Sequence, residues 1–262
     1  TVTTFSDLQS AATAGEPSIE IRGRIQAPGQ TLKLGQTNGV ANLDGMTVIR
    51  GGHLDITGIV FGAARRFKLH AMEVWATGAA VTQTGAIQTY YEDCYLYSPT
   101  YCLDLQTVAG TWIRGCHFNG IGASAQGIRV GASSGGYEAL NVGNCLFESC
   151  FTDVRVGGTG NCVNLNFHHN WHDRPISAAY LFAPQGTSNV RNVKISDEWV
   201  NGADYPICVS LGETAGRIDR LDTSGLFQLL GCSHGLVTVF GDSSRFSGTQ
   251  AATVVTGPLE PG

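Results

Sequence analysis

Apolar residues recur along this chain with one spacing. In segment 140–147 the apolar residues that recur are Leu140, Val142 and Phe147, and Cys145 stands two positions before the last of them. Counted back from position 0 at Phe147, apolar side chains lie at −5 and −7, and a small or sulfur-bearing one lies at −2. We call this set a rung. Other rungs end at Val74, Leu96, Phe118, Val200 and Leu226, and a partial one, which keeps only its first half, ends at Asn170.

The distances between rungs indicate a solenoid. Position 0 recurs at residues 74, 96, 118, 147, 170, 200 and 226, so repeats span 22 to 30 residues (96 − 74 = 22; 200 − 170 = 30). Repeats of this length bury their apolar faces only by stacking on one another. A second, shorter run of alternating residues follows each rung, as at 103–105, 128–130 and 154–156, and a period of two is typical of strands. The pattern therefore predicts an all-β fold, a parallel β-helix with one strand per side of each coil.

The whole chain, residues 1–262, is predicted to be one domain, because no linker interrupts the repeats. Residues 1–16 are expected to form a capping helix, since Ser6 and Gln9 have capping-box spacing and a short apolar stripe ends at Gly15. Residues 17–241 are expected to form the coils, and 242–262 an edge strand and a tail.

Three cysteines share one position of the repeat. Cys94, Cys116 and Cys145 all stand at −2, where equivalent residues of successive coils lie about 4.8 Å apart and small polarizable side chains stack. This placement favours buried, reduced thiols and folding in a reducing compartment. Disulfides between Cys150 and Cys162, or between Cys94 and Cys102, stay open as alternatives.

Charge and hydropathy limit the classes of partner that we expect this chain to bind. Charged residues make up 14% of the 262 residues and the net charge is −5, which excludes a sequence-independent grip on nucleic acid phosphates. No apolar run is long enough to span a bilayer as a helix, so we expect no membrane partner.

Four segments resemble the pectate lyases. Residues 2–11 and 17–25 resemble the opening of that family, with its capping helix and first strand. Segment 111–118, Thr-Trp-Ile-Arg-Gly-Cys-His-Phe, is similar to the family's Trp-Ile-Asp-His-Cys strand, and 166–171, Asn-Phe-His-His-Asn-Trp, to its His-His-Asn strand. The resemblance implies a right-handed parallel β-helix and a polysaccharide substrate.

The sequence differs from the pectate lyase pattern at the family's calcium site. The family's calcium-binding Asp corresponds to Arg114, its His to Gly115, and Arg174-Pro175 is a shortened remnant of its catalytic arginine segment. We therefore predict no cofactor: calcium is compatible with the family but not supported by this motif. Paired His residues without a third ligand at a suitable spacing give no metal site either.

Positions −6, −1 and +1 of each rung should point to solvent if the apolar set points in. Aromatic rings occur there together with amides, acids and cations, which predicts a sugar-binding strip. Trp75 and Asn119 stand at +1. The predicted substrate-binding residues are Tyr90, Tyr95, Tyr97, Trp112, Glu148, Trp171, Lys194 and Trp199. Burial of these rings under loops or a neighbouring subunit is the competing interpretation.

The partial rung contains the densest polar cluster, 168–174, and local failure of a repeat is where function or strain is expected. β-Elimination of a uronate needs a base and a cation. The candidate catalytic residues are His169, His172, Asp173 and Arg174, with Arg114 and His117 two coils earlier. Hydrolysis would instead use two carboxylates from Glu148, Asp173 and Asp197. His168 and Asn170 themselves are expected to face the interior.

Two functions follow. The first is a carbohydrate-active protein acting on an acidic polysaccharide, with a polysaccharide lyase favoured; the second is a non-catalytic virion β-helix, such as a phage tailspike or capsid appendage, that binds glycan or builds structure. The expected partner is a polysaccharide, a homotrimer is a possible assembly, and the expected location is a virion or the cell exterior.

Overall fold

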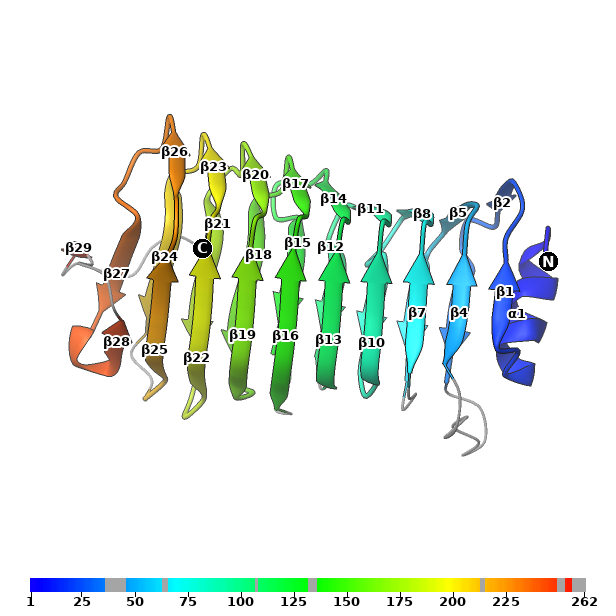
Figure 1. The fold of residues 1–262 in the computed structure, drawn as a ribbon, viewed down its shortest axis with the longest axis horizontal. Coiled ribbons are helices and arrows are strands. Elements are labelled where there is room, and N and C mark those ends of the chain that lie inside the picture. The colour runs from blue at the N-terminus through cyan, green and yellow to red at the C-terminus, as the bar shows by residue number, and fades with distance from the viewer. Residues whose placement is uncertain are drawn as a thin grey trace.

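The computed structural model describes residues 1–35, 46–62, 66–106, 108–131, 136–212, 215–248 and 253–255. Its strands form three parallel sheets, and successive strands of one sheet come from successive turns of the chain. Figure 1 shows the strands of one of these sheets side by side along the long axis, with helix α1 (Phe5–Ala14) at one end. The predicted parallel β-helix is therefore confirmed.

Sheets 1 and 2 come first in each turn. Sheet 1 consists of β1 (Ser18–Glu20), β4 (Thr47–Arg50), β7 (Phe67–His70), β10 (Ile87–Glu92), β13 (Val108–Arg114), β16 (Tyr137–Gly143), β19 (Cys162–His168), β22 (Asn189–Ser196), β25 (Arg217–Ser224) and β28 (Phe246–Gly248). Sheet 2 consists of β2 (Arg24–Gln26), β5 (His53–Ile56), β8 (Glu73–Ala76), β11 (Tyr95–Ser98), β14 (His117–Gly120), β17 (Leu146–Glu148), β20 (Trp171–Asp173), β23 (Trp199–Asn201) and β26 (Gln228–Leu230).

Sheet 3 completes each turn. It consists of β3 (Thr31–Leu34), β6 (Gly58–Phe61), β9 (Val81–Gln83), β12 (Tyr101–Leu105), β15 (Gln126–Val130), β18 (Thr152–Gly158), β21 (Ala178–Pro184), β24 (Tyr205–Leu211), β27 (Val237–Gly241) and β29 (Thr253–Val255). The short helix η1 (Ser243–Arg245) precedes β28. Strand β29 pairs with β27, where an edge strand was expected.

Helix α1 caps the first coil as predicted, but its N-cap is different. The Thr4 side chain accepts a hydrogen bond from the Asp7 backbone N–H, whereas Ser6 lies inside the helix. Leu8 faces the core and is fully buried. Gly15 ends the helix with a left-handed φ of 72°, a conformation that glycine adopts without steric cost.

A single residue in the left-handed conformation turns the chain from sheet 1 to sheet 2. Asp93, Asn144, His169 and Asp197 hold this place, with φ values between 54° and 58°. The tight turn fixes which residues of the following strand face inward. Positions −2 and 0 are buried, and positions −1 and +1 face outward, as in Cys116, His117, Phe118 and Asn119.

The register corrects two rungs. Phe147 pairs with His172, so His172 stands at position 0 and Asn170 at −2, two residues later than the sequence pattern predicted. Asn170 is buried as expected, but His168 is not inside: its ring lies over Gly143 on the outer side of sheet 1. In the last rung Val200 pairs with Leu229, and Leu226 is 66% exposed.

All eight cysteines are free thiols, so neither of the alternative disulfides is present. Cys94, Cys116 and Cys145 are buried, as predicted from their shared position. A hydrogen bond to the Cys116 thiol, with burial, raises the pKa of Cys94 well above its usual range. Separately, no helix in the described part of the chain is long and apolar enough to cross a membrane.

Candidate functional site

The outer side of sheet 2 carries most of the predicted site. Residues at −1 and +1 flank the inward residue at position 0, so alternation in the strand points them to solvent. Of the predicted residues, this side holds Tyr95, Tyr97, His117, Glu148, Trp171, Asp173 and Trp199, and Arg174 follows in the next turn.

Aromatic rings stack at two places on this side. Trp75 lies 4.4 Å from Tyr97 between ring centroids at an interplanar angle of 26°, and Trp171 lies 4.3 Å from Trp199 at 6°. Trp75 and Trp171 are 37% and 44% exposed. The aromatic face, defined as Trp75, Tyr95, Tyr97, Trp171 and Trp199, therefore offers ring faces and edges to a ligand. Trp75 was not among the predicted site residues, although its +1 position marked it as outward.

A histidine and a glutamate connect the two ring groups. Nε2 of His117 lies 2.9 Å from Oε2 of Glu148, and the amide of Asn119 donates to the same oxygen at 3.2 Å. Asn119 also donates to the Tyr95 hydroxyl at 3.1 Å. The side chains of His117 and Glu148 are 29% and 33% exposed, so solvent reaches this pair. The carboxylate fixes the orientation of the imidazole, as it does for a general base.

The next coil adds a second carboxylate. Asp173 is the register partner of Glu148, which places their backbones about 4.8 Å apart. Asn201 donates to Asp173 at 3.0 Å, and the exposed Arg174 donates to it at 3.2 and 3.3 Å. Glu148 and Asp173 are therefore close enough to form the carboxylate pair that the hydrolytic alternative requires. Asp197 lies instead in the turn before β23 and accepts from the backbone of Leu226.

His172 lies inside the solenoid, away from the other candidates. Its side chain is fully buried and stacks on Phe147 at 4.9 Å and 2°. Nδ1 lies 2.9 Å from Asp153 and Nε2 lies 3.2 Å from Glu198, and both carboxylates are fully buried too. His172 stands at position 0 of its rung, which faces the core, so its side chain does not reach a polymer on the surface. The predicted grouping of His172 with the outward residues is therefore wrong.

The charges of this buried cluster depend on one another. Burial raises the pKa of Asp153 to about 6, although its hydrogen bond to His172 opposes the rise. For His172, burial disfavours the charge, but the hydrogen bonds to Asp153 and Glu198 outweigh it and raise the pKa to about 9. At neutral pH His172 is therefore an imidazolium, and its two ring nitrogens lie beside the side-chain oxygens of Asp153 and Glu198. Asn170 donates to Glu198 at 3.2 Å and completes the cluster.

The remaining predicted residues lie on sheet 1 or beside it. Tyr90 and Trp112 stack at 4.9 Å and 11° on the outer side of sheet 1, where Lys194 also lies. Arg114 ends β13, and His169 occupies the left-handed turn before sheet 2, with Nδ1 3.2 Å from Nδ1 of His168. These residues face a different side from the aromatic face.

The described residues contain no group of three or more His, Cys, Asp or Glu side chains arranged to hold a metal ion. Chemically, the outer side of sheet 2 offers ring faces, the imidazoles of His53 and His117, each beside a carboxylate, and the adjacent carboxylates of Glu148 and Asp173 with the exposed Arg174.

Comparison with solved structures gives distant matches. The surface protein and adhesin PfbA of Streptococcus pneumoniae matches with 12% identity and a TM-score of 0.47, over 95% of this chain and 90% of that one. An alginate lyase from Paenibacillus sp. matches with 9% identity and a TM-score of 0.38, over 94% and 97%. Likeness at this level says nothing of what this chain binds or cleaves. No protein-family model matches the chain, and no curated protein matches its sequence.

Proposed function

We propose that this β-helix is a carbohydrate-active protein that holds a polysaccharide along the aromatic face. The observation that carries the proposal is the presence of two stacked ring pairs on the outer side of sheet 2, Trp75 on Tyr97 and, beyond two intervening coils, Trp171 on Trp199. Trp75 and Trp171 are the exposed members of the two pairs. Aromatic rings present apolar area to the C–H faces of sugars while leaving hydroxyls free to hydrogen-bond.

Polar groups between the rings match those hydroxyls. Polar side chains on four neighbouring coils supply amide donors and carboxylate acceptors: Asn119, Glu148, Asp173 and Asn201. Because strand spacing repeats every coil, a linear polymer lying along the solenoid axis meets such groups at regular intervals.

Affinity electrophoresis tests binding directly. The wild type should be retarded in gels that contain the polysaccharide it binds, and a Trp75→Ala/Tyr97→Ala variant should lose most of this retardation. The matched control is Tyr90→Ala on sheet 1, which should migrate as the wild type does. Failure of a broad panel of neutral and acidic polysaccharides to retard the wild type would overturn the proposal.

Cleavage by β-elimination is the second candidate, favoured by the 2.9 Å contact between His117 and Glu148. In this reaction His117 removes the C5 proton of a uronate, the C4–C5 double bond forms, and the C4–O bond breaks with its oxygen taking up a proton. Arg174, an exposed cation that follows β20, stabilises the developing negative charge on the substrate carboxylate.

The near-ultraviolet absorbance of unsaturated uronate, followed with polyuronates in the presence and absence of calcium, separates the two candidates. Binding with product formation supports the lyase. Binding without product from any substrate leaves a glycan-binding protein, such as a virion appendage.

A further inference from the structure

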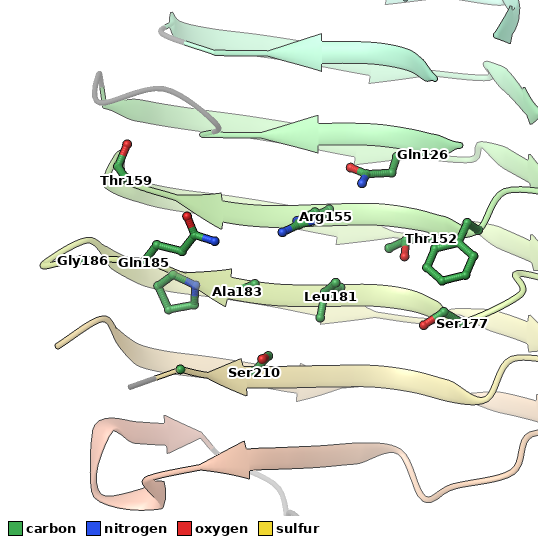
Figure 2. A pocket seen from close by; sticks show the side chains of 13 residues that line it. Gln126, Thr152, Arg155, Thr159, Ser177, Leu181, Ala183, Gln185, Gly186 and Ser210 are labelled. Carbon is green, nitrogen blue, oxygen red and sulfur yellow. The ribbon is translucent and has the colours of Figure 1, made fainter. Parts of the chain in front are cut away.

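Sheet 3 carries a hollow on the side opposite its apolar interior. The hollow has a volume of about 630 Å³ and extends over strands β15, β18, β21 and β24. This volume is within the range of roughly 300–1,000 Å³ that small-molecule sites have. Figure 2 shows Arg155 in its middle, with Gln185 toward one end and Gln126, Thr152 and Ser177 toward the other.

Two arginines stand one coil apart here, and a carboxylate, Asp104, lies on the coil before the first of them. Arg129 and Arg155 are register partners on β15 and β18. Arg129 donates to both oxygens of the buried Asp104, at 2.8 and 2.7 Å, and its guanidinium lies 3.8 Å from the centre of the Tyr101 ring. Gln106 donates a further hydrogen bond to Asp104 at 2.7 Å, so the hydrogen-bond partners of this carboxylate are Arg129 and Gln106.

Arg155 has no hydrogen bond or ion pair with any described residue, although it is half-buried. Burial lowers the pKa of Arg155, and the neighbouring charge of Arg129 lowers it further. A half-buried guanidinium retains its charge and gains most from a planar anion that takes two parallel hydrogen bonds.

A second unsatisfied group lines the same hollow. Gln126 is only 8% exposed, and its Oε1 has no hydrogen-bond partner. A buried acceptor left without a donor costs about 1–3 kcal/mol, so a ligand hydroxyl that donates to it is favoured. The hydroxyls of Thr152, Ser177 and Ser210 add further polar groups to the lining.

We propose that this hollow is a binding site for an acidic saccharide, whose carboxylate or sulfate pairs with Arg155 while its hydroxyls meet Gln126 and the lining hydroxyls. The arrangement fits a saccharide because it combines one uncompensated cation with several neutral hydrogen-bonding groups, rather than a cluster of cations. This site lies on sheet 3 and is separate from the aromatic face on sheet 2.

Isothermal titration calorimetry with three probes of equal size tests the proposal on the full chain. The probes are digalacturonate, a sulfated neutral disaccharide, and the neutral disaccharide itself. The wild type should bind at least one acidic probe about tenfold or more tightly than the neutral one. Which acidic probe binds identifies the anion as carboxylate or sulfate. Equal affinity for all three probes, or binding of none, would overturn the proposal.

Variants locate the site. Arg155→Gln should weaken acidic-probe binding about tenfold or more and leave neutral-probe binding unchanged. Arg50→Gln, which removes the same charge from an exposed position on β4 of sheet 1, should bind as the wild type does. Trp171→Ala, on the aromatic face, distinguishes the two sites. If Trp171→Ala abolishes acidic-probe binding and Arg155→Gln does not, the acidic saccharide binds sheet 2 and the inference fails while the proposed function stands.

Discussion

Two histidines, each held by carboxylates, show how a single position along a strand separates surface chemistry from core stability. His117 stands at −1 of its rung, 29% exposed, beside Glu148. His172 stands at position 0 two coils later, fully buried between Asp153 and Glu198. Both histidines were candidate bases in the sequence, but the alternation of side chains along a strand points His117 outward and His172 inward.

The difference assigns the two groups different tasks. The outer pair, His117 and Glu148, is open to solvent. The inner cluster, His172 with Asp153, Glu198 and Asn170, interrupts a column of apolar side chains that runs through Phe118 and Phe147. Breaking a buried charge pair leaves an uncompensated charge in the core, whereas replacing the whole group by apolar residues does not. Substitutions therefore distinguish the inner cluster from the outer pair by their effect on stability.

The largest effect is expected for His172→Phe. It continues the phenylalanine column but leaves Asp153 and Glu198 buried without their shared partner, which should lower the free energy of unfolding by about 3–5 kcal/mol. Urea unfolding followed by circular dichroism measures this loss. A change below about 1 kcal/mol would show that the cluster is not charged in the fold.

The pH dependence of stability reports the same cluster. The pKa of His172 rises from 6.5 to about 9 on folding, so its stabilising contribution is complete below pH 6.5 and is lost as the pH rises through 9. The pKa of Asp153 rises from 3.8 to about 6, and its contribution is likewise lost as the pH rises through 6. At about 1.36 kcal/mol per unit, the His172 shift alone corresponds to about 3 kcal/mol. Urea midpoints that rise or stay constant between pH 6.5 and 9 would contradict this.

Replacing the whole cluster should restore stability. Asn170→Cys, His172→Phe and Glu198→Cys give the residues that preceding coils hold at the same positions, and Asp153→Ala matches Ala179 of the next coil. This fourfold variant should equal the wild type or exceed it by about 1–4 kcal/mol, and its stability should not fall between pH 6.5 and 9. Thermal unfolding at both pH values is the measurement; a variant less stable than His172→Phe alone would be the opposite result.

The smallest stability effect belongs to the outer pair. His117→Gln keeps a hydrogen-bonding side chain beside Glu148 and should change the free energy of unfolding by less than about 1 kcal/mol. The rate of unsaturated uronate formation should fall about 100-fold or more, because the base is lost, while polysaccharide binding persists. A variant that cleaves as fast as the wild type removes His117 as the base.

The fold could be predicted from the sequence because the rung repeats the same physical requirement in every coil. The spacing identified Cys94, Cys116 and Cys145 as core and placed Tyr95, His117 and Trp171 outside. The pattern failed at Asn170 because polar residues replace the apolar marks that define the rung, and the register slipped by two. With the register wrong by two residues, the sequence pattern did not predict that His172 faces inward.

Contacts between residues of different sheets could not be predicted from the sequence pattern either. Asp153 lies on sheet 3 and Glu198 precedes a strand of sheet 2, and only the closed coil brings both to His172. The uncompensated charge of Arg155 likewise follows from the register between coils: Asp104 pairs with Arg129 on the next coil, and Arg155 lies one coil further from that carboxylate.

Binding along the aromatic face is tested most directly by two matched tryptophans. Trp171 and Trp112 are 44% and 40% exposed and each stacks on a ring of a neighbouring coil, but Trp171 lies on sheet 2 and Trp112 on sheet 1. For the polysaccharide that retards the wild type, the dissociation constant of Trp171→Ala should rise about fivefold or more, and that of Trp112→Ala should stay unchanged. An unchanged constant for Trp171→Ala, or a larger rise for Trp112→Ala, would contradict the assignment of the glycan to sheet 2.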